Sequence, residues 1–108
     1  MTPTTSWLLL VAAGLLEVAF ALGLKAANGL QRPWILAGTL LVLAGSLGLL
    51  TLALRQLPVG TAYATWTGIG AVGTALAGML WMGDSASIGR LACMGLIVGG
   101  VMGLRWLP

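Results

Sequence analysis

A single carboxylate, Glu17, lies in the middle of an apolar run from Trp7 to Leu24, within the stretch "GLLEVAFA". An ionised side chain surrounded by hydrocarbon is costly unless it is paired, hydrated or protonated, and such groups commonly mark ion or proton pathways. We therefore expect Glu17 to be a protonatable site for a cation. The alternative is a carboxyl group that only holds helices together by hydrogen bonds, for which Ser or Thr would be less costly.

Aromatic and hydroxyl side chains that suit a cation follow in the stretch "PVGTAYATWTGIGAVG". Tyr63, Trp66 and Thr67 lie within about one helical turn of one another, so they can face one cavity. Aromatic faces attract cations, and planar guanidinium groups stack on them. Tyr63 could instead anchor the helix at a membrane interface. Trp66 lies about 10 Å deeper than Val59 at 1.5 Å per residue, so interface anchoring explains it less easily.

Glu17 and a second polar residue, Ser46, are expected at the same depth. Glu17 comes ten residues after Trp7, which is about 15 Å along a helix and near the midplane of a hydrocarbon core about 30 Å thick. Ser46 lies thirteen residues after Pro33 and nine before Arg55, again near the middle. Both side chains can therefore reach one central cavity.

Helical spacing places a row of residues on the same face of the first segment as Glu17. The small members of this row, which include Gly14, leave space around the carboxylate, and we expect Gly14 and Phe20 to take part in the cation- and proton-binding site with Glu17. The row consists of Leu10, Ala13, Gly14, Glu17, Phe20, Ala21 and Leu24.

The residue inventory excludes several kinds of chemistry. The chain has no histidine and one cysteine, Cys93, so a zinc site, a Ser-His or Cys-His nucleophile and an intrachain disulfide are not expected. The five basic residues are dispersed between apolar runs, unlike the basic stripe of a nucleic-acid-binding protein. We expect no enzyme activity, no cofactor, no metal and no nucleic-acid partner. Asp84 is assigned to a solvated loop with no catalytic role.

The composition indicates a membrane protein. Of the 108 residues 59% are hydrophobic and only 6% are charged, whereas about a quarter of the residues of a soluble domain are charged. Four apolar segments each approach the roughly 20 residues that a helix needs to cross a bilayer. We predict an all-α integral membrane protein with four transmembrane helices, over residues 6–26, 33–54, 59–82 and 88–107.

Short connectors with turn residues, "NGLQRP", "RQLPVG" and "GDSASIG", make sequential helices antiparallel. The four helices are expected to form a single domain over residues 1–108. The first segment could alternatively be a signal peptide, with Ala19-Phe20-Ala21 resembling a cleavage site. Against this, "MTPTTS" has no basic residue, Glu17 interrupts the apolar run, and three more segments follow.

The basic residues barely favour one orientation in the membrane. Lys25, Arg32 and Arg90 are expected on one side, and Arg55, Arg105 and the terminal amine on the other. With three bases against two and an amine, the positive-inside rule gives almost no preference. Either another feature sets the topology, or the chain inserts in both orientations and pairs with its inverted copy, which we expect.

Glycines recur on two segments. In the fourth, Gly95, Gly99 and Gly103 share one helix face in a GxxxGxxxG pattern, which lets another helix approach closely. We expect this stripe to form a dimer contact, with packing inside one subunit as the alternative. The third segment has glycines that permit either a hinge or close packing: Gly68, Gly70 and Gly73.

Taken together, "GLLEVAFALGLK" with its central Glu, "LPVGTAYATWTGIGAVG" and the glycine-rich last segment resemble the small multidrug resistance transporters over essentially the whole chain. "WTGIG" after "GTAYA" resembles the guanidinium-exporter subtype, whereas exporters of quaternary ammonium drugs more often carry a serine after the tryptophan. Two positions depart from the pattern. Phe20 stands where guanidinium exporters usually have tryptophan, and Arg105 stands where a lysine is usual.

The resemblance implies an antiparallel homodimer in the bacterial inner membrane that exchanges protons for a small organic cation. It matches the family's proton- and substrate-binding glutamate to Glu17, the aromatic residues of its cavity to Trp66 and Tyr63, and its hydrogen-bonding serine to Ser46. We expect proton-coupled export of guanidinium and small substituted guanidinium ions, with protons and substrate competing for Glu17. One alternative is an exporter of quaternary ammonium and other lipophilic cations, for which Phe20 argues. Another is a non-transporting membrane subunit or assembly factor.

Overall fold

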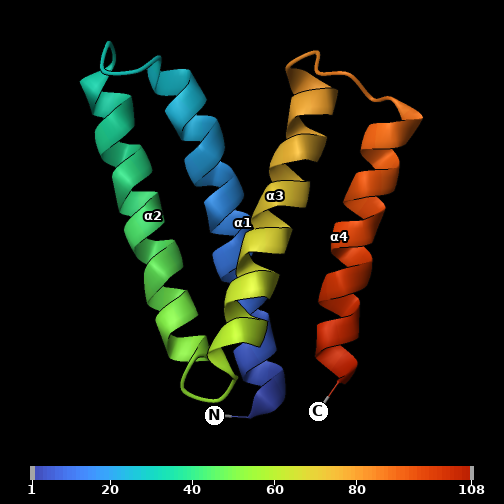
Figure 1. The fold of residues 1–108 in the computed structure, drawn as a ribbon. Coiled ribbons are helices and arrows are strands. Elements are labelled where there is room, and N and C mark those ends of the chain that lie inside the picture. Colours follow the sequence, from blue (N-terminus) through green and yellow to red (C-terminus); the bar gives the residue numbers. More distant parts are fainter. Residues whose placement is uncertain (1, 108) are drawn as a thin grey trace.

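The computed structural model describes residues 2–107 and is all-α within them. Figure 1 shows its helices in chain order, with bounds α1 (Pro3–Ala27), α2 (Pro33–Ala53), α3 (Val59–Trp81) and α4 (Ile88–Trp106). The first helix begins at Pro3, before the apolar run, because polar residues cap it. The side chain of Thr2 accepts a 3.1 Å hydrogen bond from the Thr5 N–H, and proline at the start of a helix needs no backbone partner.

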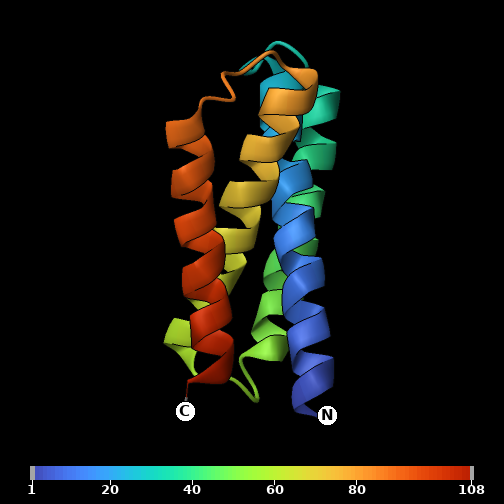
Figure 2. The same cartoon turned by 90° about the vertical axis from the view of Figure 1, so that its right-hand side faces the viewer.

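Successive helices run antiparallel, and both termini lie at the same end of the molecule (Figures 1 and 2). The Cα atoms span 44 × 35 × 17 Å, and the longest dimension is close to the about 40–45 Å of a bilayer with its headgroups. The α1–α2 and α3–α4 connectors lie at one end. Lys25, Arg32 and Arg90 are therefore at that end, while Arg55 and Arg105 are at the other.

The helices are packed unevenly. The α1 backbone lies close to those of both α2 and α3, whereas, within residues 2–107, the α4 backbone comes close to α3 alone. Figure 1 shows α4 at the edge of the molecule beside α3. None of the residues of α4 is buried, so this helix is available for contacts outside the chain.

Among the described residues, three helices are long and apolar enough to cross a membrane: α1, α2 and α4. The sequence predicts four such helices. The fourth, α3, has sufficient length, but its hydropathy is lower than that of the other three. Five glycines and four threonines account for the difference, since neither residue type contributes much apolar surface. Three of these glycines, Gly68, Gly70 and Gly73, allow α3 to approach its neighbours closely, since an added Cβ at each would lie 2.5–2.7 Å from a side chain of another helix.

A small apolar core joins α1, α2 and α3 near the end of the molecule that holds the termini. It is built around Trp66, with Leu10, Ala13, Leu50, Ala53 and Ala62. Three of these residues are alanines, so the helices meet by close approach of their backbones instead of by large interlocking side chains. The core fixes the α1–α3 pairing that carries Glu17.

Candidate functional site

A chain of buried hydrogen bonds links the three helices next to Glu17. The Trp66 Nε1–H on α3 donates to Ser46 Oγ on α2 over 2.9 Å. The Ser46 hydroxyl in turn donates to the backbone carbonyl of Ala13 on α1 over 2.6 Å. Ala13 precedes Glu17 by four residues, so its carbonyl is also the helical acceptor for the Glu17 N–H. One hydroxyl thereby fixes both the indole and the turn of α1 that presents the carboxylate.

The Glu17 carboxylate points toward α3 and lies against Gly70. A Cβ added to Gly70 would lie 2.5 Å from Cδ and Oε2 of Glu17 and 2.9 Å from Oε1. The Oε2 atom is buried and has no hydrogen-bond partner within residues 2–107. A buried carboxylate oxygen without a partner is costly. It is therefore a ready acceptor for a proton or for an N–H group of a ligand.

Tyr63 extends the aromatic surface outward from Trp66. The two ring centroids are 5.6 Å apart and the planes are tilted by 52°, within the range of centroid distances over which aromatic rings attract one another. Trp66 is 8% exposed, whereas Tyr63 is 57% exposed in the single chain. The site thus has a fixed, buried indole and an accessible phenol ring on the same turn of α3.

The remaining predicted residues have different surroundings. Gly14 is buried and faces Ile69 on α3, where an added Cβ would lie 2.6 Å from Ile69 Cγ2. The absence of a side chain at Gly14 lets α1 and α3 approach each other closely. Phe20 is partly buried on α1, one turn beyond Glu17. A direct part for Gly14 or Phe20 in cation binding stays a prediction.

Sequence reasoning assigned Gly70 only to a hinge or to close packing, and the structure adds its contact with the carboxylate. The sequence does indicate that Gly70 lies near the site, because Gly70 follows Trp66 by four residues and so shares its helix face. The backbone carbonyl of Ala13 was also missed. No sequence pattern identifies which carbonyl a serine will select.

The predicted glycine stripe of α4 is open in the single chain. Gly95, Gly99 and Gly103 are exposed, and an added Cβ at any of them would meet no atom within 4 Å. The stripe therefore packs against no other helix of this subunit. This removes intrasubunit packing as its explanation in this structure.

Comparison with known proteins identifies the fold family. Residues 5–97 match the family described as Small Multidrug Resistance protein. A protein of Salmonella typhimurium named "Guanidinium exporter" is 54% identical over 102 residues, covering 93% of this chain and 95% of its own. Proteins of the same name from Yersinia pseudotuberculosis and Citrobacter freundii are 51% and 52% identical over 100 residues. They cover 93% of this chain and 96% and 95% of their own lengths.

The family match covers most of the helical bundle, and the relatives are matched over nearly their full lengths. Three helices of membrane-spanning length and hydropathy agree with the transporter character of the family. The chain is therefore a multi-pass membrane protein that belongs to the small multidrug resistance family.

Proposed function

We propose that this protein is a proton-coupled antiporter that exports guanidinium and small substituted guanidinium cations. The observation that carries the proposal is the position of the Glu17 carboxylate, against Gly70 and beside the hydrogen bonds from Trp66 through Ser46 to Ala13. The relatives named guanidinium exporter are about half identical to this chain over nearly all of it, which favours this substrate class.

The chemistry of the site suits a flat cation that carries several N–H donors. A carboxylate can accept two parallel N–H bonds from one guanidinium group, a geometry that an ammonium group cannot copy. In Glu17, the buried Oε2 has no protein partner among the described residues and is free to accept such a bond. The tilted rings of Tyr63 and Trp66 offer faces on which the guanidinium plane can stack.

Proton transport and guanidinium transport are coupled because both ions compete for the Glu17 carboxylate. Glu17 holds either a proton as the neutral acid or a cation as the carboxylate, and both states leave the buried site close to neutral. Binding of guanidinium on the cytoplasmic side releases the proton there, and a proton from outside later displaces the cation. Because protons compete with substrate, the apparent dissociation constant for guanidinium should rise as the pH falls.

The working unit in this proposal is an antiparallel homodimer in the bacterial inner membrane, with all four helices crossing the bilayer. The open face of α4 at Gly95, Gly99 and Gly103 supports such a contact between copies. The nearly even distribution of basic residues between the two ends supports insertion in both orientations. In the dimer, two Glu17 carboxylates and the exposed Tyr63 rings would face one shared cavity.

Export of bulky quaternary ammonium ions by the same mechanism is the second candidate. The observation that favours it is Phe20, one helical turn from Glu17, where a tryptophan would supply an indole N–H. A benzyl side chain offers an apolar face without a donor. Such a face suits an alkylated cation that has no N–H groups to satisfy.

The test uses purified full-length protein in liposomes with an imposed pH gradient, and measures uptake of guanidinium driven by protons. Glu17→Gln should abolish this uptake, whereas Asp84→Asn, which neutralises the other acid of the chain, should leave it intact. Normal transport by Glu17→Gln would overturn the proposed mechanism. Transport of tetrapropylammonium in place of guanidinium by the unaltered protein would instead support the second candidate.

A further inference from the structure

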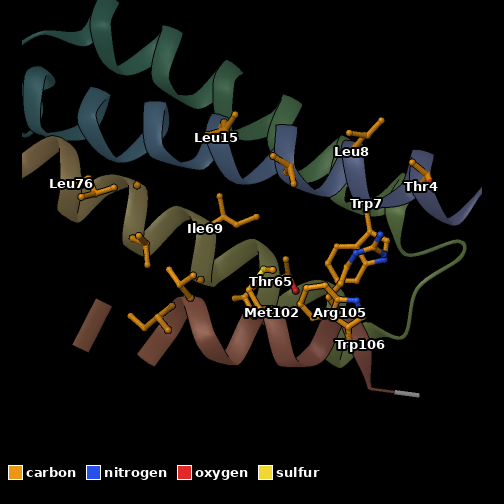
Figure 3. Close-up of a pocket in the computed structure, with 17 residues that line it drawn as sticks. Thr4, Trp7, Leu8, Leu15, Thr65, Ile69, Leu76, Met102, Arg105 and Trp106 are labelled. Atoms are coloured by element: carbon orange, nitrogen blue, oxygen red, sulfur yellow. The ribbon is translucent and has the colours of Figure 1, made fainter. Parts of the chain in front are cut away.

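A long groove lies between α1, α3 and α4, away from the candidate cation site (Figure 3). Its volume is about 560 Å³, and along most of its length its walls are aliphatic, with Leu15, Ile69 and Val98 among them. It exists because α4 packs beside α3 and leaves a gap toward α1. Neither the predicted cation-binding residues nor the glycine stripe of α4 line it.

One end of this groove carries a positive charge between aromatic rings. Figure 3 shows Arg105 and Trp106 of α4 close to Trp7 of α1. The Arg105 Cζ atom lies 4.8 Å from the centroid of the Trp7 ring. Tryptophans beside a basic residue at a helix end are typical of the boundary between headgroups and hydrocarbon.

Within residues 2–107, neither acidic side chain lies near Arg105. The sequence has two acidic residues. Glu17 lies near the middle of α1, and Asp84 lies in the α3–α4 connector at the opposite end of the molecule. The guanidinium group of Arg105 therefore has hydrogen-bond donors to offer to an anion at the end of the groove.

A buried hydroxyl lies next along the groove. Thr65 is 1% exposed, and its Oγ1 has no hydrogen-bond partner within residues 2–107. Its place is six residues into α3, about 9 Å from the end of that helix at Val59. In Figure 3, Thr65 lies between the cluster around Arg105 and the aliphatic walls. A ligand that satisfies the Thr65 hydroxyl therefore needs a hydrogen-bond acceptor deeper in the groove than the anionic group that binds Arg105.

We propose that the groove is a binding site for one anionic glycerophospholipid. The order of the groups matches such a lipid: Arg105 for the phosphate, the Thr65 hydroxyl for an ester carbonyl, and the aliphatic walls for an acyl chain. A methylene group is about as large as a water molecule, which occupies about 30 Å³. A groove of about 560 Å³ therefore holds roughly 18 methylene groups, close to one fatty acyl chain. The positive charge of Arg105 disfavours a cationic group in the same place.

The first test measures lipid binding to the delipidated full-length protein by native mass spectrometry. Dioleoyl phosphatidylglycerol and dioleoyl phosphatidylcholine have the same chains, but only the first has a net negative charge. Arg105→Gln should weaken phosphatidylglycerol binding about tenfold through the lost charged hydrogen bond, and should remove the preference over phosphatidylcholine. Arg55→Gln is the matched control, a cation at the same end of the molecule outside the groove, and should change neither.

Equal effects of the two arginine variants would overturn the proposal, because they would indicate unspecific attraction of anionic lipid to the protein surface. Inorganic phosphate at the same concentration should not compete with the lipid, since it lacks the chain that fills the groove. Competition by inorganic phosphate alone would indicate a simple anion site and would also contradict the proposal.

A second test fills the apolar part of the groove. Val98→Trp should weaken binding of both lipids about tenfold or more, whereas Leu41→Trp, on the exposed face of α2, should not. Both variants should keep the helix content and the dimer of the unaltered protein. If Val98→Trp instead disrupts the dimer and leaves lipid binding unchanged, the groove receives a helix of the second copy and the lipid proposal fails.

Discussion

The Glu17 carboxylate on α1 lies so close to Gly70 on α3 that a Cβ at Gly70 would lie 2.5 Å from Oε2. Two further glycines make the same kind of contact between these helices, Gly14 with Ile69 and Gly73 with Val18. Glycine along this seam therefore lets α1 and α3 approach closely at the depth where the carboxylate lies. The position of the Glu17 carboxylate thus depends on the absence of a side chain at Gly70 on the neighbouring helix.

Gly70→Ala should therefore displace the Glu17 carboxylate and lower guanidinium transport by between about ten- and 100-fold, the range expected when a reacting group is moved by about 1 Å. The measurement is proton-driven guanidinium uptake into liposomes. Gly48→Ala on α2 is the control, because its added Cβ would meet no atom within 4 Å. Equal transport by both variants would show that the Gly70 contact is unimportant for function.

The candidate site could be predicted in part. Glu17, Ser46, Trp66 and Tyr63 were selected from residue type, depth and helical spacing, and the structure places Ser46 and Trp66 in one hydrogen-bonded chain with Tyr63 beside it. The choice of the Ala13 carbonyl as acceptor could not be predicted. It depends on how α1 and α2 are rotated against each other, which the largely apolar sequences of both helices, with few polar residues each, leave undetermined.

Ser46→Ala should destabilise the protein by about 1–3 kcal/mol, because the Trp66 Nε1–H would remain buried without an acceptor. The free energy of unfolding can be measured by titration with sodium dodecyl sulfate, followed by circular dichroism. Thr51→Ala is the control. Its exposed hydroxyl bonds only the Leu47 carbonyl of its own helix, at 2.8 Å, and its loss should cost less than about 0.5 kcal/mol.

The double variant Ser46→Ala/Trp66→Phe separates this hydrogen bond from general packing effects. Phenylalanine has no N–H, so the serine substitution should cost less in its presence. The cost of the double change should therefore fall short of the sum of the two single changes by about 1 kcal/mol. Strict additivity would mean that the bond between Trp66 and Ser46 does not contribute to stability.

The positions of the helices follow closely from the apolar runs, because short connectors with turn residues and charged residues separate these runs. Two features of the fold do not. The glycines of α3 are visible in the sequence, but which side chains of the neighbouring helices they contact depends on how the helices are rotated against one another. The groove between α1 and α4 depends on the angle at which α4 leaves α3, and no periodicity in the sequence specifies that angle.

Gly99→Leu should weaken the association of two copies. A leucine in the middle of the open glycine stripe would hold the partner helix away, and overpacking of this kind should raise the dissociation constant of the dimer about tenfold or more. Energy transfer between labelled copies in liposomes at decreasing protein-to-lipid ratios measures this constant. Gly38→Leu on α2, another glycine in open space, should leave it unchanged, and a similar loss in both variants would argue against a specific contact.

Dual topology predicts that each end of the molecule is found on both sides of the membrane. In a Cys93→Ser background, Gln31→Cys and Gln56→Cys place single exposed cysteines in connectors at opposite ends. Since the basic residues give almost no preference, a membrane-impermeant maleimide added to intact cells should label roughly half of each variant. Complete labelling of one variant with none of the other would establish a single orientation. Adding basic residues to one connector would then provide a second check, because they should shift the labelled fraction of the two variants in opposite directions.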